Sequence, residues 1–103
     1  INLNQLINGP SVPNPVEFLG CEYINNKVVI FGGRKGGGII TDEVYKLPII
    51  NPINITSSWI QINSLLQPRR FVNTVAVNDY VFILNGDDGT SAINTVEVYD
   101  AIN

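Results

Sequence analysis

The sequence predicts an all-β protein built from a repeated unit. Two segments, residues 23–33 and 76–86, align with each other, and their last apolar residues, Phe31 and Leu84, lie 53 positions apart. Each segment holds a short run rich in Val, Ile and aromatic residues with Asn and Gly at its ends, which is typical of a β-strand. No stretch places apolar residues at a sustained 3.6-residue spacing, so we expect no helix.

The local signals predict four strands in the first unit and three in the second. They are expected at residues 18–24, 27–31, 40–46 and 59–62, and then at residues 72–77, 80–84 and 94–99. Asn25-Asn26 and Asn78-Asp79 stand between the first two strands of each unit. Asn and Asp tolerate the positive φ of a tight turn, so each pair predicts a β-hairpin.

These strands divide the chain into three parts. Residues 1–16 are expected to hold the last strand of a preceding unit and a linking loop rich in proline. Residues 17–66 form a complete unit, and residues 67–103 form the first three strands of the next one. The linking loop is not the interior of a strand, because proline has no N–H to give to a sheet.

Several short motifs follow these strands in a fixed order. In order along the chain they are Gly32-Gly33, Tyr45, Trp59, Pro68-Arg69 and the phrase Asn-Thr-Val-Glu-Val-Tyr-Asp at residues 94–100. A period near 50 residues is typical of propeller blades, whereas helical solenoids repeat at shorter spacings. With these motifs at this period, the chain resembles the kelch repeat from about Gly9 onward.

The resemblance implies a β-propeller fragment with blades of four antiparallel strands around a central axis. It assigns structural roles to glycine and aromatic residues at the repeated positions, which are Gly32, Gly33, Tyr45, Trp59, Gly86 and Tyr99. The three aromatic residues are expected to pack between neighbouring blades. Two blades do not close a ring, so further blades are expected from the same chain or from other copies, for example three chains making six blades.

The chain departs from the kelch pattern at three places. Asn85-Gly86 replaces two glycines in the second unit, and we expect the turn to survive because Asn is the best substitute at positive φ. The loop between Tyr45 and Trp59 is longer than the family norm. The sequence Asn-Pro-Val at residues 14–16 lacks the arginine of the Pro-Arg element that precedes the second unit.

Composition excludes several function classes. Six Lys and Arg against nine Asp and Glu give a net charge of −3, which does not provide the basic footprint that nucleic acid requires. No apolar run is long enough to span a membrane and no signal peptide opens the chain, so we expect an intracellular, cytoplasmic protein. The chain begins at Ile1 and contains no Met, and we expect an excerpt of a longer protein rather than a processed product.

Residues that commonly carry catalysis or bind metals are scarce. There is no His, and the one cysteine, Cys21, has neither a second Cys nor a His for a zinc site. Its apolar neighbours predict a small core residue rather than a reactive thiol. We therefore expect no cofactor, no metal and no enzymatic activity in this segment.

Three further motifs have plain interpretations. In the glycine-rich loop at residues 32–38 the lysine precedes the glycines and a strand follows, whereas a phosphate-binding loop opens a helix. Asp87-Asp88-Gly89 lacks the additional oxygen ligands that Ca²⁺ requires. Asn54-Ile55-Thr56 is a glycosylation sequon in the enlarged loop, which we interpret as a chance match.

The candidate binding residues are charged and lie in loops that a propeller would project from one face. They are Arg34, Lys35, Arg69, Arg70, Asp87 and Asp88. Basic side chains on a rigid rim can hold an acidic peptide through charge-assisted hydrogen bonds. The alternative is that Arg69 ties one blade to the next and the other side chains are only solvated.

The sequence favours a binding module, a kelch propeller segment that scaffolds a protein partner within a larger protein or assembly. A second possibility is a segment of a propeller enzyme similar to the galactose oxidase family, with its active site elsewhere. A third is a two-blade chain that trimerises into a lectin-like six-bladed ring, although Trp59 is the only tryptophan available as a sugar platform.

Overall fold

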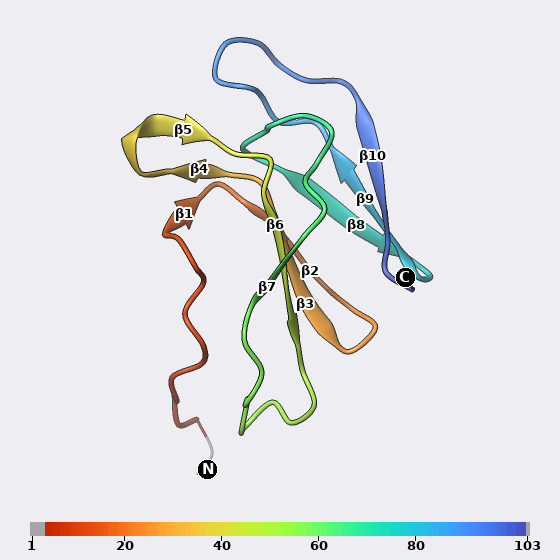
Figure 1. Cartoon of the computed structure of the whole chain (residues 1–103). Coiled ribbons are helices and arrows are strands. Elements are labelled where there is room, and N and C mark those ends of the chain that lie inside the picture. Colours follow the sequence, from red (N-terminus) through yellow and green to blue (C-terminus); the bar gives the residue numbers. More distant parts are fainter. Residues whose placement is uncertain (1–3, 103) are drawn as a thin grey trace.

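In the computed structural model, two antiparallel sheets pack face to face (Figure 1). The structure describes residues 4–102. The first sheet has the strand order β2-β3-β6-β7, with bounds Gly20–Ile24, Lys27–Phe31, Val44–Pro48 and Ile60–Ile62. The second has the order β10-β9-β8, with bounds Val96–Asp100, Tyr80–Leu84 and Asn73–Val77. The described residues contain no α-helix, so the all-β prediction is confirmed.

A small third sheet lies at one end of the molecule. Its order is β1-β4-β5, with bounds Val16–Glu17, Arg34–Lys35 and Ile39–Ile40. The short 3₁₀ turn η1 (Gly36–Gly38) joins β4 to β5, and its two positive-φ glycines reverse the chain. The sequence predicted a plain loop here followed by one strand at residues 40–46. That strand is instead divided into β5 and β6.

The other expected strands lie close to their predicted positions. The hairpin turns are as expected, because Asn25, Asn26 and Asn78 have φ of 49°, 60° and 54°. Asn85 has φ of 58°, so the turn that replaces a double glycine does survive. Residues 4–15 contain no strand and residues 1–3 lie outside the described part, so a preceding unit at residues 1–16 stays a prediction.

The core lies between the two larger sheets. Val29 and Phe31 of β3 and Val81 and Ile83 of β9 are almost completely buried and belong to one cluster. The ring of Tyr99 meets that of Phe31 edge-on at 5.7 Å. Tyr99 of the second unit therefore packs against Phe31 of the first, and full burial of an aromatic ring contributes about 2–3 kcal/mol.

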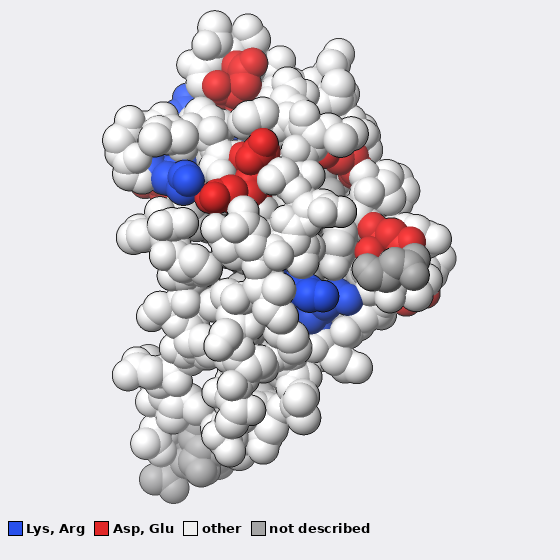
Figure 2. Space-filling view, viewed as in Figure 1, with Lys and Arg blue, Asp and Glu red and all other residues white. Residues whose placement is uncertain are grey.

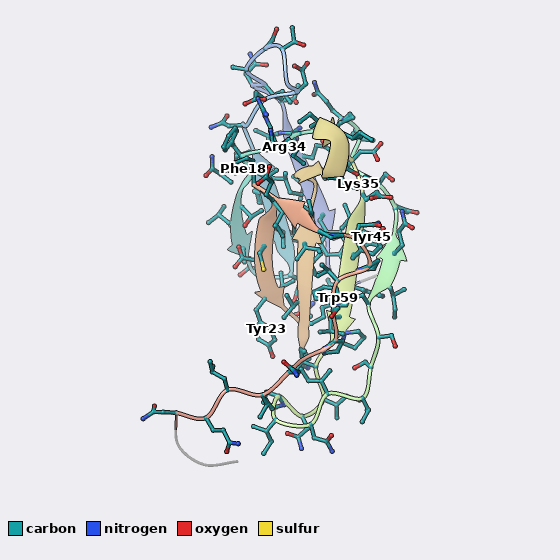
Figure 3. The ribbon with its side chains drawn as sticks, turned by 90° about the vertical axis from the view of Figure 1, so that its left-hand side faces the viewer. Phe18, Tyr23, Arg34, Lys35, Tyr45 and Trp59 are labelled. Carbon is teal, nitrogen blue, oxygen red and sulfur yellow. The ribbon has the colours of Figure 1, made fainter. Side chains whose placement is uncertain are left out.

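Tyr45 and Trp59 have a different environment from Tyr99. Both are half-buried, and the Trp59 Nε1 donates a hydrogen bond to the Pro10 carbonyl at 2.9 Å. Tyr45 lies beside Val12 and Pro13 of the same N-terminal segment. In Figure 3 both side chains lie on the side of the first sheet that is turned toward the viewer. Their packing between blades stays a prediction, because here the N-terminal segment covers them.

The prediction that Cys21 is a core residue is wrong. Side chains alternate between the two faces of a strand, and β2 buries Gly20 while it exposes Cys21. Partial desolvation and the neighbouring Glu22 raise the pKa of the Cys21 thiol, so the thiol is not activated as a nucleophile.

Candidate interaction face

The loops at one end of the two units pair in the same way. In the first unit β1 pairs with β4, which sets Glu17 opposite Arg34. In the second unit Arg70 forms a bridge with Asp87, through backbone hydrogen bonds of 2.9 and 3.1 Å. Positions 17 and 70, and positions 34 and 87, are each separated by the 53-residue repeat. The repeat therefore extends upstream of the segments that the sequence comparison aligned.

Both pairs are salt bridges, but their polarity is reversed. Arg34 donates through Nε and Nη2 to the Glu17 carboxylate, with the Nε bond at 2.6 Å. Arg70 Nε donates to Asp87 Oδ1 at 2.8 Å. The hydrogen bonds from Arg70 and from the Gly89 amide hold the pKa of Asp87 below its usual range. The two units thus keep an ion pair at equivalent positions with acid and base exchanged.

Two phenylalanines lie between these ion pairs. Phe18 and Phe71 are equivalent positions of the repeat, and their ring centroids are 4.3 Å apart. The Arg34 guanidinium lies 5.4 Å from the centroid of the Phe18 ring, and that of Arg70 lies 5.2 Å from the Phe71 ring. Figure 3 shows Phe18 and Arg34 together, well away from Tyr45 and Trp59. We call these four residues, Phe18, Arg34, Phe71 and Arg70, the Arg–Phe platform.

Both phenylalanines have a costly backbone conformation. Their φ angles are 59° and 52°, which is rare for a bulky side chain and typically costs about 1–3 kcal/mol. An aromatic pair returns about 0.5–1.5 kcal/mol beyond the area it buries. Phe18 and Phe71 remain 41% and 46% exposed as residues, so burial offsets only part of this cost. The Phe71 amide donates to the Phe18 carbonyl at 2.8 Å, which joins the two strained positions.

Glycine permits the close approach that builds this face. At Gly86, with φ of 89°, a Cβ would lie 2.2 Å from the Arg70 carbonyl oxygen. At Gly33, with φ of 105°, it would lie 2.7 Å from the Glu17 carbonyl oxygen. The repeated glycines are therefore required where the segment leading into each unit meets the loop that follows its second strand.

Arg69 lies in the interior rather than on the face. Its side chain is 0% exposed and pairs with Glu97 at 2.9 Å. It also donates to the Asn85 carbonyl at 3.1 Å and to the Thr95 carbonyl at 3.0 Å. These contacts fit a structural role for Arg69 rather than partner binding. Arg69 ties the link between the units to two segments of the second unit.

The remaining candidate residues are held by their neighbours. Lys35 Nζ pairs with Glu43 at 3.1 Å. The Asp88 carboxylate accepts hydrogen bonds from the Thr90 and Ser91 amides at 2.9 and 2.8 Å, and these bonds lower its pKa. Asp88 therefore shapes its own turn. Whether any of these residues binds a partner stays a prediction.

Charge is unevenly distributed over the surface. In the view of Figure 2, side chains of both signs lie around the upper loops and across the middle of the molecule, and the lower end is almost free of charge. Residues 4–15 and 49–58, which form much of that lower end, contain no charged residue. Charged side chains are therefore concentrated away from this lower end of the molecule.

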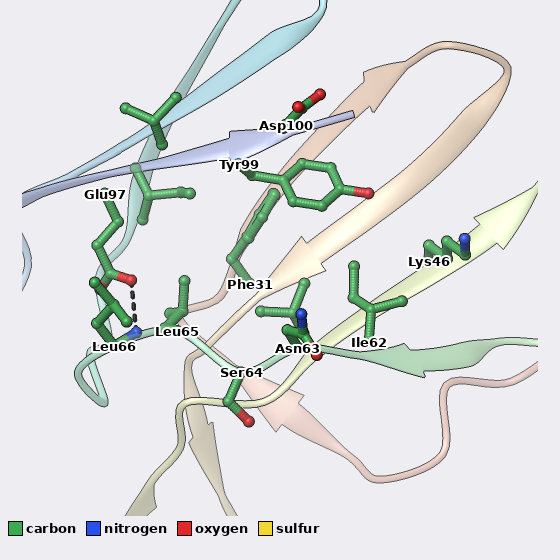
Figure 4. Close-up of a pocket in the computed structure, with 13 residues that line it drawn as sticks. Phe31, Lys46, Ile62, Asn63, Ser64, Leu65, Leu66, Glu97, Tyr99 and Asp100 are labelled. Atoms are coloured by element: carbon green, nitrogen blue, oxygen red, sulfur yellow. Dashed lines mark hydrogen bonds between the residues drawn. The ribbon is translucent and has the colours of Figure 1, made fainter. Parts of the chain in front are cut away.

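A groove of about 440 Å³ lies between the outer strands of the two larger sheets (Figure 4). Its lining includes Phe31, Ile62 and Leu65 on one side and Tyr99 on the other. The amide of Leu66 donates to Glu97 Oε1 at 2.6 Å and closes one end. The groove is mainly apolar, and no described residue lining it is a His or Cys.

The described residues contain neither a cluster of metal ligands nor a membrane-spanning helix. No group of three or more His, Cys, Asp or Glu residues lies close enough together to hold a metal ion. Within residues 4–102 there is also no helix with the length and hydropathy needed to cross a membrane.

Comparison with known proteins reveals a distant similarity to repeat proteins, which is consistent with the repeated β-structure. No family model matches the chain. The chain is distantly similar to kelch repeat proteins. It is 22% identical over 89 residues to the "Kelch repeat and BTB domain-containing protein 2" of cowpox virus, in both the GRI-90/Grishak and the Brighton Red strains. The match covers 86% of this chain but 15% of the length of each relative.

The kelch-like features are also the ones that position the candidate face. The glycines after the second strand admit the linking segment, and the buried arginine before the second unit fixes that segment. These glycines and this arginine were predicted from the sequence, whereas Glu17, Phe18 and Phe71 were not. Extending the 53-residue alignment upstream to position 17 would have identified the repeated phenylalanine, although not the contact between the two rings.

Proposed function

We propose that this chain is a segment of a kelch-type β-propeller that binds a protein partner through one surface, which we call the loop face. The loop face consists of residues 17–18, 34–35, 70–71 and 87–88 and includes the Arg–Phe platform. The observation that carries the proposal is that both units present an arginine, an acid and an exposed phenylalanine at the same end. Aromatic residues and arginine are enriched where proteins meet. The distant similarity to kelch repeat proteins supports a protein-interaction module.

The second sheet supports the propeller part of the proposal. Val29, Phe31 and Val44 lie on the face that the first sheet buries. Their equivalents by strand register, Phe82, Leu84 and Val96, lie on the face of the second sheet that is turned away from the first. Val98 lies on the same face, and Val96 and Val98 are 51% and 53% exposed. An apolar face of this kind is suited to packing against another blade.

Placing a charge on this outer face tests the blade arrangement. In the full protein, Val98→Asp should lower the melting temperature if another blade covers Val98, because an unpaired buried carboxylate is costly. Thr90→Asp in an exposed loop is the control. An unchanged melting temperature for Val98→Asp would show that the face is solvated and that no blade packs there.

Neutralising the basic residues of the loop face tests the binding function. We expect a partner captured from cell extract to bind R34Q/K35Q/R70Q at least about tenfold more weakly, because these residues supply the cationic donors of the face. Lys46→Gln, on β6 and outside the loop face, is the matched control. Equal capture by the triple variant, with unchanged melting temperature, would contradict the proposal.

A further inference from the structure

The Arg–Phe platform combines exposure, strain and repetition. Phe18 and Phe71 remain almost half exposed although both have positive φ. A strained and exposed aromatic residue lowers the free energy of unfolding, and such residues cluster at binding sites. The platform therefore points to a ligand rather than to a structural contact only.

The arginine beside each phenylalanine comes from a different position in the two units, because the ion pairs have opposite polarity. In the first unit the arginine over the phenylalanine comes from position 34, after the second strand. In the second unit it comes from position 70, directly before the phenylalanine. The arginine position differs between the units, but each ring still has a guanidinium at 5.2–5.4 Å. Both units therefore keep an arginine next to an exposed phenylalanine, although the arginine comes from different positions.

The guanidinium groups retain donors for a ligand. Arg70 Nε donates a hydrogen bond to Asp87. Within the described part of the chain, the two terminal nitrogens of Arg70 make no hydrogen bond. Arg34 uses Nε and Nη2 for Glu17, which leaves Nη1. The side chain of Arg34 is 37% exposed and that of Arg70 is 24% exposed, so solvent and ligands can reach both. Terminal guanidinium nitrogens pair preferentially with carboxylates.

We propose that the Arg–Phe platform binds an extended peptide with an apolar side chain between two acidic residues. The apolar side chain lies on the exposed surfaces of Phe18 and Phe71, and the carboxylates accept hydrogen bonds from Arg34 and Arg70. This inference rests on the proposed function and specifies the partner that the face selects.

Three labelled peptides test the inference by fluorescence anisotropy with the full protein. The first has a central Phe between two Asp residues, the second has Lys in place of Asp, and the third has Ala in place of Phe. We expect the first to bind at least about tenfold more tightly than either of the others, because each lacks one of the two recognised groups. Equal affinities, tighter binding of the lysine peptide, or no detectable binding of the first would overturn the inference.

The variant F18N/F71N separates a binding role from a structural one. Asn accepts positive φ, so the double variant should keep the melting temperature while its affinity for the acidic peptide falls at least about tenfold. Tyr23→Asn is the control, because Tyr23 is an exposed aromatic residue of β2 outside the platform. A large loss of melting temperature with unchanged peptide affinity would show that the stacked rings are structural and would overturn the inference.

The same variants separate this inference from the proposed function. If F18N/F71N still captures the cellular partner but R34Q/K35Q/R70Q does not, the loop face binds its partner without the aromatic rings. The inference then fails and the proposed function stands. If neither variant affects capture or peptide binding, both fail.

Discussion

The two units share one backbone plan but differ in the residues that hold it. Each has a phenylalanine with positive φ, a positive-φ turn after its second strand and an ion pair across the loop face. The first unit uses Gly32 and the Glu17–Arg34 pair, whereas the second uses Asn85 and the Arg70–Asp87 pair. Both units therefore keep the same backbone geometry. The side chains differ where another residue can serve the same purpose.

The largest expected effect is at the junction of the units, where Arg69 has no counterpart in the first unit because Val16 stands there. Arg69→Met should destabilise the protein by about 4 kcal/mol, because it leaves the nearly buried Glu97 carboxylate without its partner. Urea unfolding measures the change. R69M/E97Q should recover part of the loss, and no recovery would show that the ion pair is not the source of the effect.

The close approach at Gly86 gives the next largest effect. Gly86→Ala should cost about 3 kcal/mol, because the added Cβ would lie 2.2 Å from the Arg70 carbonyl oxygen. Gly37→Ala also has positive φ, at 80°, but its Cβ has no heavy atom within 4 Å. This control isolates the cost of φ alone, about 1 kcal/mol. Similar losses for both variants in thermal unfolding would contradict the packing argument.

The exchanged ion pairs predict that each unit accepts the polarity of the other. Glu17→Arg and Arg34→Glu should each destabilise the first unit by about 0.5–1 kcal/mol, and E17R/R34E should restore stability, because it reproduces the order of the second unit. A double variant less stable than both single variants would show that polarity is fixed by some other contact.

The second ion pair should also depend on pH. The pKa of Asp87 is lowered in the folded state, so this group stabilises the protein above its unfolded pKa of about 3.9 and loses that contribution as pH falls through the lower folded value. Melting temperatures of wild type and D87N between about pH 7 and pH 2 should therefore converge on acidification. A constant difference between them would contradict the role of the Asp87 carboxylate.

The smallest effect is expected at Asn85. Asn85→Gly should change stability by less than about 0.5 kcal/mol, because Asn already accepts positive φ well. Gly32→Asn should cost more, because a Cβ there would lie 2.5 Å from the Arg69 carbonyl oxygen. Chemical denaturation of both variants would measure the difference, and equal costs would remove this distinction between the units.

Much of the fold could be predicted because its signals are local or repeated. The Asn-rich hairpins, the runs of β-branched residues and the 53-residue spacing gave the positions of the main strands. The hairpin of β4 and β5 was missed because each strand has two residues, too few for a periodic pattern. Cys21 was placed in the core because its neighbours are apolar, but the alternation of β2 decides which face it occupies.

The candidate site was less predictable for a physical reason. The charged loop residues were visible in the sequence, but their partners come from segments far along the chain, as in the contacts of Arg69 with residues 85 and 95. The stacking of Phe18 on Phe71 depends on how closely two units approach. Sequence periodicity alone does not give that distance.

The most direct test of the central claim is hydrogen–deuterium exchange of the full protein with and without its captured partner. We predict that protection concentrates at residues 17–18, 34–35, 70–71 and 87–88, because these segments form the loop face. The uncharged loop at residues 49–58 should exchange equally in both states. Protection of that loop, with no change around the Arg–Phe platform, would contradict the account.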